Sequence, residues 1–137
     1  MINSIYFENN ELKLKSSAAT PILYREMFKK DLIKTVMTFQ TIKDSLPAEG
    51  EEQKDDEKVK AFLETNGLEF LDFLKELAFI MNLEATVPAT DIFSKLNFTQ
   101  YVVFLSSYDE QIFYKNSSEI MSVYNASTKT ASKSKNA

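Results

Sequence analysis

The sequence predicts a mainly α-helical fold: a small helical domain of about five helices, with a short N-terminal β-hairpin and a disordered C-terminal tail. Apolar residues recur at steps of three and four along most of the chain, which is the period of a helix buried on one face. Residues 4–15 instead alternate apolar and polar side chains, as a β-strand does. Residues 125–137 contain no large apolar side chain.

The composition indicates one folded domain over residues 1–124. Hydrophobic residues make up 44% of the 137 residues and aromatic residues 12%, which is enough for one core in a chain of this length. The net charge of -4 disfavours nucleic acid as a partner, because its binders usually carry a basic surface. No stretch approaches the roughly 20 apolar residues of a membrane span, and the N-terminus lacks the pattern of a signal peptide. We therefore expect a cytoplasmic protein with no nucleic-acid or membrane partner.

Few side chains are suited to catalysis. The chain has no cysteine and no histidine, which excludes thiolate chemistry, zinc–sulfur sites and histidine bases. Arg25 is the only arginine, and Gly50 and Gly67 are the only glycines, so there is no glycine-rich phosphate loop. The acidic pairs within residues 51–56 lack the apolar surroundings that raise a carboxyl pKa for acid catalysis. We expect no enzyme activity, no cofactor and no metal site.

The predicted hairpin turns at Asn9-Asn10. Ile5, Phe7, Leu12 and Leu14 are the apolar positions of its two strands. Because a two-stranded sheet is not stable alone, we expect these four side chains to pack on the helices that follow.

Thr20-Pro21 predicts the start of a helix, since threonine can cap free amides and proline suits the first helical position. Apolar residues recur at helical steps from Leu23 to Phe39, so the helix is predicted to end shortly before Pro47. Residues 47–58 are polar and mostly acidic. They are typical of a solvated loop or a frayed helix start, and an electrostatic contact surface is the alternative.

A central helix is predicted over residues 68–83, where apolar side chains cover more than one face. These side chains can instead form a groove for a partner helix, so core and groove remain alternatives. Asn66-Gly67, just before this segment, predicts a bend or a helix end.

Three shorter elements are predicted after Pro88. Thr90-Asp91 begins a short helical turn, and a helix with a break near Ser106-Ser107 is expected over residues 99–114. Capping residues then precede a final amphipathic helix that begins near Ser117. The tail, residues 125–137, is predicted to be disordered, either as a solvated tail or as a basic electrostatic arm.

Residues 12–32, LKLKSSAATPILYREMFKKDL, resemble the opening of the tail assembly chaperones of long-tailed (siphovirus-type) bacteriophages that infect Gram-positive bacteria. In that family a short β segment leads into a helix marked by Tyr-Arg, Phe and Lys-Asp. Here these positions are Tyr24-Arg25, Phe28 and Lys30-Asp31. The glycine that frequently follows the phenylalanine in the family is replaced by Lys29.

The resemblance continues through residues 67–82, which look like the family's second apolar helical block, and through residues 91–98, which resemble its short closing motif. It implies a protein that coats the tape measure protein in the host cytoplasm, keeps it soluble and is absent from the mature virion. It also implies a homo-oligomer. A longer form made by translational frameshifting would recruit the major tail (tube) protein, and residues 127–137 would suit the linker of such a form.

Six residues are predicted to bind a partner: Tyr24, Arg25, Phe28, Phe70, Phe73 and Leu77. Tyr24 and Phe28 lie one helical turn apart, so packing against each other in the core is the alternative. Two other functions remain open from the sequence. One is a small helical structural or adaptor component of a virion, such as a head–tail connector, and the other is an inhibitor whose acidic loop mimics nucleic acid.

Overall fold

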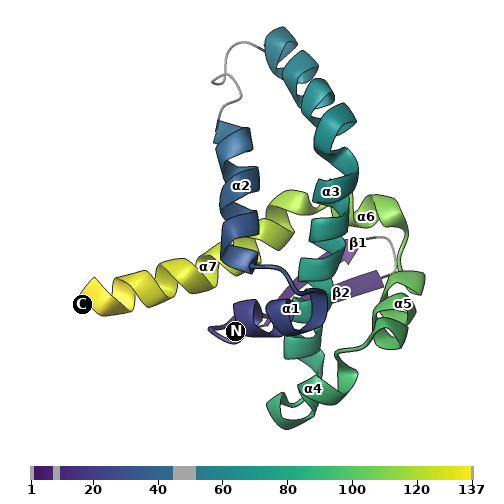
Figure 1. Cartoon of the computed structure of the whole chain (residues 1–137), viewed down its shortest axis with the longest axis vertical. Coiled ribbons are helices and arrows are strands. Elements are labelled where there is room, and N and C mark those ends of the chain that lie inside the picture. Colours follow the sequence, from purple (N-terminus) through teal and green to yellow (C-terminus); the bar gives the residue numbers. More distant parts are fainter. Residues whose placement is uncertain (1, 8–9, 45–51, 137) are drawn as a thin grey trace.

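The computed structural model describes the backbone of residues 2–7, 10–44 and 52–136, and the side chains of residues 2–6, 10–39 and 69–126. These residues form seven α-helices and one two-stranded antiparallel sheet (Figure 1). The predicted fold class, mainly α with an N-terminal hairpin, is therefore confirmed.

In chain order the elements are β1 (Asn3–Phe7), β2 (Asn10–Leu14), α1 (Thr20–Phe28), α2 (Leu32–Asp44), α3 (Glu52–Thr86), the 3-10 helix η1 (Ala89–Asp91), α4 (Ile92–Lys95), α5 (Phe98–Ser106), α6 (Glu110–Lys115) and α7 (Ser117–Asn136). The central element is α3, which contacts β2, α1, α4, α5, α6 and α7. Its first half and α2 project away from the rest of the molecule as two arms (Figure 1).

The hairpin packs on the helices as predicted. Ile5 pairs with Leu12 across the two strands, and Ile5, Leu12 and Leu14 are all buried. The side chain of Phe7 lies outside the described residues. Alternation of side chains along each strand therefore places one face of the sheet in the core.

Two hydrogen bonds attach β2 to α3. The backbone N–H of Lys15 donates to the carbonyl oxygen of Met81 at 2.9 Å. The side-chain amide of Asn82 donates to the carbonyl oxygen of Lys13, also at 2.9 Å. These bonds satisfy backbone groups on the outer side of β2 that a two-stranded sheet otherwise leaves open.

The single helix predicted from Thr20 towards Pro47 is wrong, because the structure has two helices there. α1 ends at Phe28, and Lys29 adopts the left-handed conformation with φ 59° and ψ 33°. Its backbone N–H donates to the carbonyl oxygen of Arg25 at 2.9 Å, which closes the last turn. A left-handed residue ends a helix. The apolar spacing does not reveal the break, because the helical period resumes within three residues.

Asp31 begins α2. Its side-chain Oδ1 accepts a hydrogen bond from the backbone N–H of Lys34 at 3.1 Å, as a helix-capping carboxylate does. Leu32 and Val36 on α2 are buried, and Phe39 is half-buried. The base of the α2 arm is thus part of the core.

α3 is continuous across Asn66-Gly67, so the predicted helix end at this pair is wrong. A lone glycine in a helix interior costs only about 1 kcal/mol relative to alanine, which is too little to end a helix of 35 residues. Residues 52–58 of the predicted acidic loop form the first turns of α3. Residues 47–51 lie outside the described residues.

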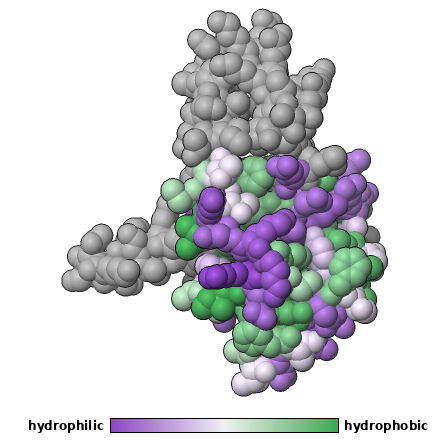
Figure 2. Space-filling view, viewed as in Figure 1, coloured by the Kyte–Doolittle hydropathy of each residue, from purple (hydrophilic) through white to green (hydrophobic). Residues whose placement is uncertain are grey.

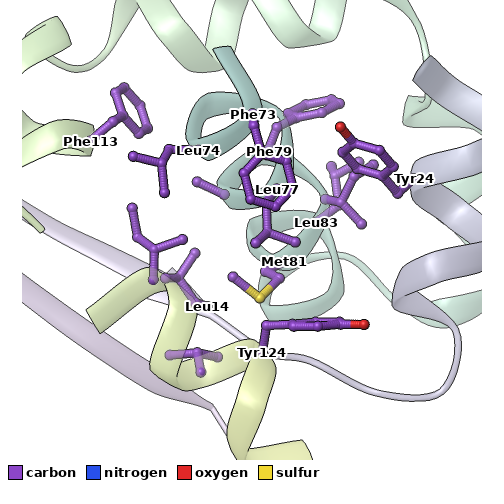
Figure 3. Packing of buried hydrophobic residues seen from close by; sticks show 14 of the residues in the cluster. Leu14, Tyr24, Phe73, Leu74, Leu77, Phe79, Met81, Leu83, Phe113 and Tyr124 are labelled. Carbon is purple, nitrogen blue, oxygen red and sulfur yellow. The ribbon is translucent and has the colours of Figure 1, made fainter. Parts of the chain in front are cut away.

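The second half of α3 is the centre of the core, as predicted (Figure 3). Seven of its residues are almost completely inaccessible: Phe73, Leu74, Leu77, Ala78, Phe79, Ile80 and Met81. Aromatic contacts extend the core towards α5 and α6. The ring centroid of Phe104 lies 5.6 Å from that of Phe79 and 5.8 Å from that of Phe113.

The C-terminal elements agree in part with the sequence. The helix break near Ser106-Ser107 separates α5 from α6, and α7 begins at Ser117, both as predicted. Tyr124 is the last buried residue whose side chain is described. The backbone of α7 continues as a helix to Asn136, the side chains of residues 127–137 lie outside the described residues, and the predicted disorder of residues 125–137 stays a prediction. Extending a helix from a packed first half needs no new nucleation.

Candidate partner-binding surface at the α1–α2 elbow

The marks of the resemblance, Tyr24-Arg25, Phe28 and Lys30-Asp31, lie at or next to the turn between α1 and α2, and we term residues 24–34 the elbow. Beneath it lies the carboxylate of Glu76 on α3, which is 9% exposed. The Tyr24 hydroxyl donates to Glu76 Oε1 at 2.6 Å. Lys30 Nζ lies 3.2 Å from Oε2 and 3.3 Å from Oε1. A buried carboxylate requires such partners, so this cluster holds the elbow against α3.

Burial and the negative charge of Glu76 act on two nearby phenols. The pKa of Tyr24 is raised above its ordinary value by burial, and further by its hydrogen bond to Glu76 and by the charge of that residue. Burial, followed by the charges of Glu76 and Asp72, likewise raises the pKa of Tyr101. Both phenols therefore keep their proton to a higher pH than an exposed tyrosine does.

Aromatic rings connect the elbow to the two arms. The ring of Phe28 lies 5.2 Å from the ring of Tyr24 and 5.2 Å from that of Tyr101, measured between centroids. On α2, the ring of Phe39 lies 5.1 Å from that of Phe70 and 5.3 Å from that of Phe73. These contacts join α1, α2 and α5 to α3 through one continuous set of rings.

The six residues predicted to bind a partner fall into three groups. Three are inside the core: Tyr24, Phe73 and Leu77. Two are partly buried against it: Phe28 and Phe70. The exposed one is Arg25. The packing of Tyr24 against Phe28, which was the structural alternative, is confirmed, and a role of these six residues in partner binding stays a prediction.

Arg25 lines an open concavity of about 540 Å³ at the elbow. The other lining residues are Ile22, Glu26, Lys29, Lys30 and Asp31. On this face, Figure 2 shows hydrophilic surface over α1 and the elbow, with apolar surface at its margins. The lining of the concavity therefore contains both charged side chains and one apolar side chain.

Several exposed apolar residues were not singled out from the sequence. On α1 and α2, Ile22 is 63% exposed, Ile33 54% and Met37 62%. Their exposure could have been predicted from their positions on the helices. Ile22, for example, lies next to Leu23 and Tyr24, which face the core, and is therefore off the buried face of α1. An apolar residue off the main stripe of a helix faces outwards.

A second exposed apolar surface lies on α4 and α5. It consists of Phe93, Phe98, Val102 and Val103, which are 45% to 73% exposed. The signal for it was the absence of any Asp, Glu, Lys or Arg from α5. Exposed helices usually carry charged residues on the face that meets water.

We also searched the described residues for a membrane-spanning helix and for a metal site. No helix there is long and apolar enough to cross a membrane. No group of three or more acidic side chains there is placed to hold a metal ion. Comparison with protein-family models, curated proteins and solved structures gave no match to this chain.

Proposed function

We propose that this chain is a phage tail assembly chaperone. It binds the helical tape measure protein, keeps it soluble in the host cytoplasm and helps to recruit the tail tube protein. Such a function needs no catalytic residue, which is consistent with a chain that has no cysteine and no histidine.

The observation that carries the proposal is the position of the family's marks at one elbow. Tyr24 and Lys30 both contact Glu76, and Asp31 caps α2. Lys29 occupies the position at which the family frequently has glycine, and its φ of 59° is the conformation that glycine adopts without steric cost. The marks of the resemblance thus have a shared physical role in one local structure.

Exposed apolar surface also supports the proposal. Ile22, Ile33 and Met37 on the two elbow helices are each more than half exposed. Ile33 and Met37 lie one turn apart on α2, and exposed apolar side chains on one face of a helix are typical of proteins that receive a partner helix. A chaperone for a long helical protein needs such a surface.

The test is co-expression with the longest helix-rich protein encoded nearby. We expect that protein to be soluble only when this chain is present, and both to elute together in size-exclusion chromatography. Light scattering of the chain alone would measure the proposed homo-oligomer. Detection of the chain in purified particles by mass spectrometry, without any solubilising effect, would instead favour a head–tail connector or another virion component.

A further inference from the structure

The hydrogen bonds of β2 show which backbone groups of β1 point to its free edge. On β2, the N–H of Lys15 and the carbonyl oxygen of Lys13 bond to α3, so they point away from β1. In an antiparallel pair, a residue whose backbone groups point outwards lies opposite another such residue. Ser4 lies opposite Lys13. The N–H and C=O groups of Ser4, and by alternation those of Ile2 and Tyr6, therefore point away from β2.

This edge of β1 is open to pairing with another strand. No described residue forms a hydrogen bond with the outward backbone groups of Ile2, Ser4 or Tyr6. The side chains of Ile2 and Tyr6 are 51% and 74% exposed. Residues 2–7, INSIYF, contain no charged residue and no proline, which are features that keep the edge strands of natural proteins from pairing.

A second copy of β1 matches this edge. Among antiparallel registers, the one that places Ser4 opposite Ser4 of the second copy pairs all three outward-pointing residues with one another, each in a hydrogen-bonded pair. On the outer face, the ring of Tyr6 then lies beside Ile2 of the second copy, and such aromatic–β-branched pairs stabilise antiparallel sheets. On the other face Ile5 lies opposite Asn3, so no charged side chain enters the contact.

Pairing with a second copy also removes the open edge from both copies. In the resulting sheet the strand order is β2, β1, β1, β2, and each outer strand is a β2 that is bonded to α3. A strand from an unrelated protein would instead bring a new outer edge of its own. A two-fold contact that uses the same surface on both copies closes on itself, and it is the commonest symmetry of soluble homo-oligomers.

We infer that two copies of this chain associate through β1 and form one continuous four-stranded antiparallel sheet. The inference deepens the proposed function, on which it rests for a chain that self-associates. It adds the strand edge at which the two copies meet and the register of their pairing.

Disulfide cross-linking tests the register. The chain has no cysteine, so one introduced cysteine can form a disulfide only between two copies. Ser4→Cys places the two thiols in a hydrogen-bonded pair whose Cα atoms are about 5.5 Å apart, which is within the range for a disulfide. Tyr6→Cys is the matched control on the same edge, because the two copies of residue 6 are about 13 Å apart along the strands in this register.

We expect Ser4→Cys to form a covalent dimer on oxidation, and Tyr6→Cys to remain a single chain on a non-reducing gel. A mixture of Ile2→Cys and Tyr6→Cys proteins should form a covalent dimer that neither protein forms alone. Cross-linking of Tyr6→Cys as readily as Ser4→Cys, or no cross-linking in Ser4→Cys and the mixture, would overturn the inference.

Light scattering coupled to size-exclusion chromatography measures how much the edge contributes to self-association. Ser4→Pro removes an N–H that points to the free edge, and proline is tolerated in edge strands. Tyr6→Lys places a charge on the edge without changing the backbone. Tyr114→Lys is the matched control, because Tyr114 is also exposed but lies on α6. Far-UV circular dichroism shows whether each variant is folded.

Ser4→Pro and Tyr6→Lys should each weaken dimerisation by about tenfold or more, and Tyr114→Lys should leave it unchanged. If Ser4→Pro does not fold, Tyr6→Lys decides the outcome. A monomeric wild type, undiminished association of folded Tyr6→Lys, or an equal loss in Tyr114→Lys would each overturn the inference.

Co-expression with the tape measure protein separates this inference from the proposed function. If the wild type keeps the long protein soluble but the cross-linking pattern is absent, the strand contact is refuted and the chaperone proposal stands. If the wild type pairs through β1 but does not keep the long protein soluble, the chaperone proposal fails and the strand contact remains.

Discussion

Lys29→Gly should stabilise the protein. A residue with a side chain costs about 1–2 kcal/mol in the left-handed conformation, which Lys29 adopts with φ 59°. Glycine also has more conformational freedom in the unfolded chain, which reduces the gain in stability by about 0.4–1 kcal/mol. Removing the Lys29 cation from the C-terminal end of α1 destabilises the protein by a few tenths of a kcal/mol. Removing its repulsion with Arg25 stabilises the protein by a similar amount, so the two effects oppose each other. The free energy of unfolding should therefore rise by about 0.5–1 kcal/mol, and the Tm by about 2–5 °C.

Urea unfolding followed by far-UV circular dichroism measures this change. Glu26→Gly is the matched control, because Glu26 is exposed in the last turn of α1 and has helical backbone geometry, so glycine there should lower the free energy of unfolding by up to about 1 kcal/mol. Lys29→Val should also destabilise, since a β-branched residue is disfavoured at positive φ. A loss of stability in Lys29→Gly, or an unchanged stability in Lys29→Val, would refute the left-handed turn.

Three further predictions concern the core and its polar cluster. Leu77→Ala should lower the free energy of unfolding by about 3–4 kcal/mol, because Leu77 is fully buried, whereas Arg25→Ala should change it by less than about 0.5 kcal/mol; similar urea midpoints would contradict this contrast. Glu76→Ala should cost about 2–3 kcal/mol, since it leaves the Tyr24 hydroxyl without its acceptor, and adding Tyr24→Phe should recover part of that loss in the same assay. The raised pKa of Tyr24 contributes stability that is fully present below the unfolded-state value of about 10 and is lost as the pH rises through the folded-state value. The urea midpoint of the wild type should thus fall more steeply above pH ~10 than that of Tyr24→Phe, and parallel curves would contradict the shift.

The helical period identifies apolar faces but does not distinguish a face that is covered by the core from one that receives a partner. Phe73 and Leu77 were predicted to bind a partner from this period, and Tyr24 was predicted to do so from the family resemblance; the structure places all three inside the core. Arg25 was predicted from the same segment and is exposed at the concavity. Whether a residue of α1 is buried or exposed depends on whether α3 packs on its face of the helix. This packing joins residues that are far apart in the sequence.

The elbow illustrates the same limit at the level of the backbone. Three residues separate α1 from α2, which is too short an interruption to disturb the apolar spacing on either side. Lysine also has no preference for the left-handed conformation that would have signalled the turn. Serine residues, in contrast, marked the break between α5 and α6, and there the prediction was confirmed.

The sequence by itself determined the mainly helical class, the hairpin, the position of the central apolar helix and the absence of cysteine and histidine chemistry. These follow from local periodicity and composition, which need no knowledge of distant contacts. The tertiary structure alone decided the direction of α2, the burial of Tyr24 and the exposure of Arg25 and Ile22. The contact between Tyr24 and Glu76 joins residues that are 52 positions apart, and such pairings depend on how helices pack against one another.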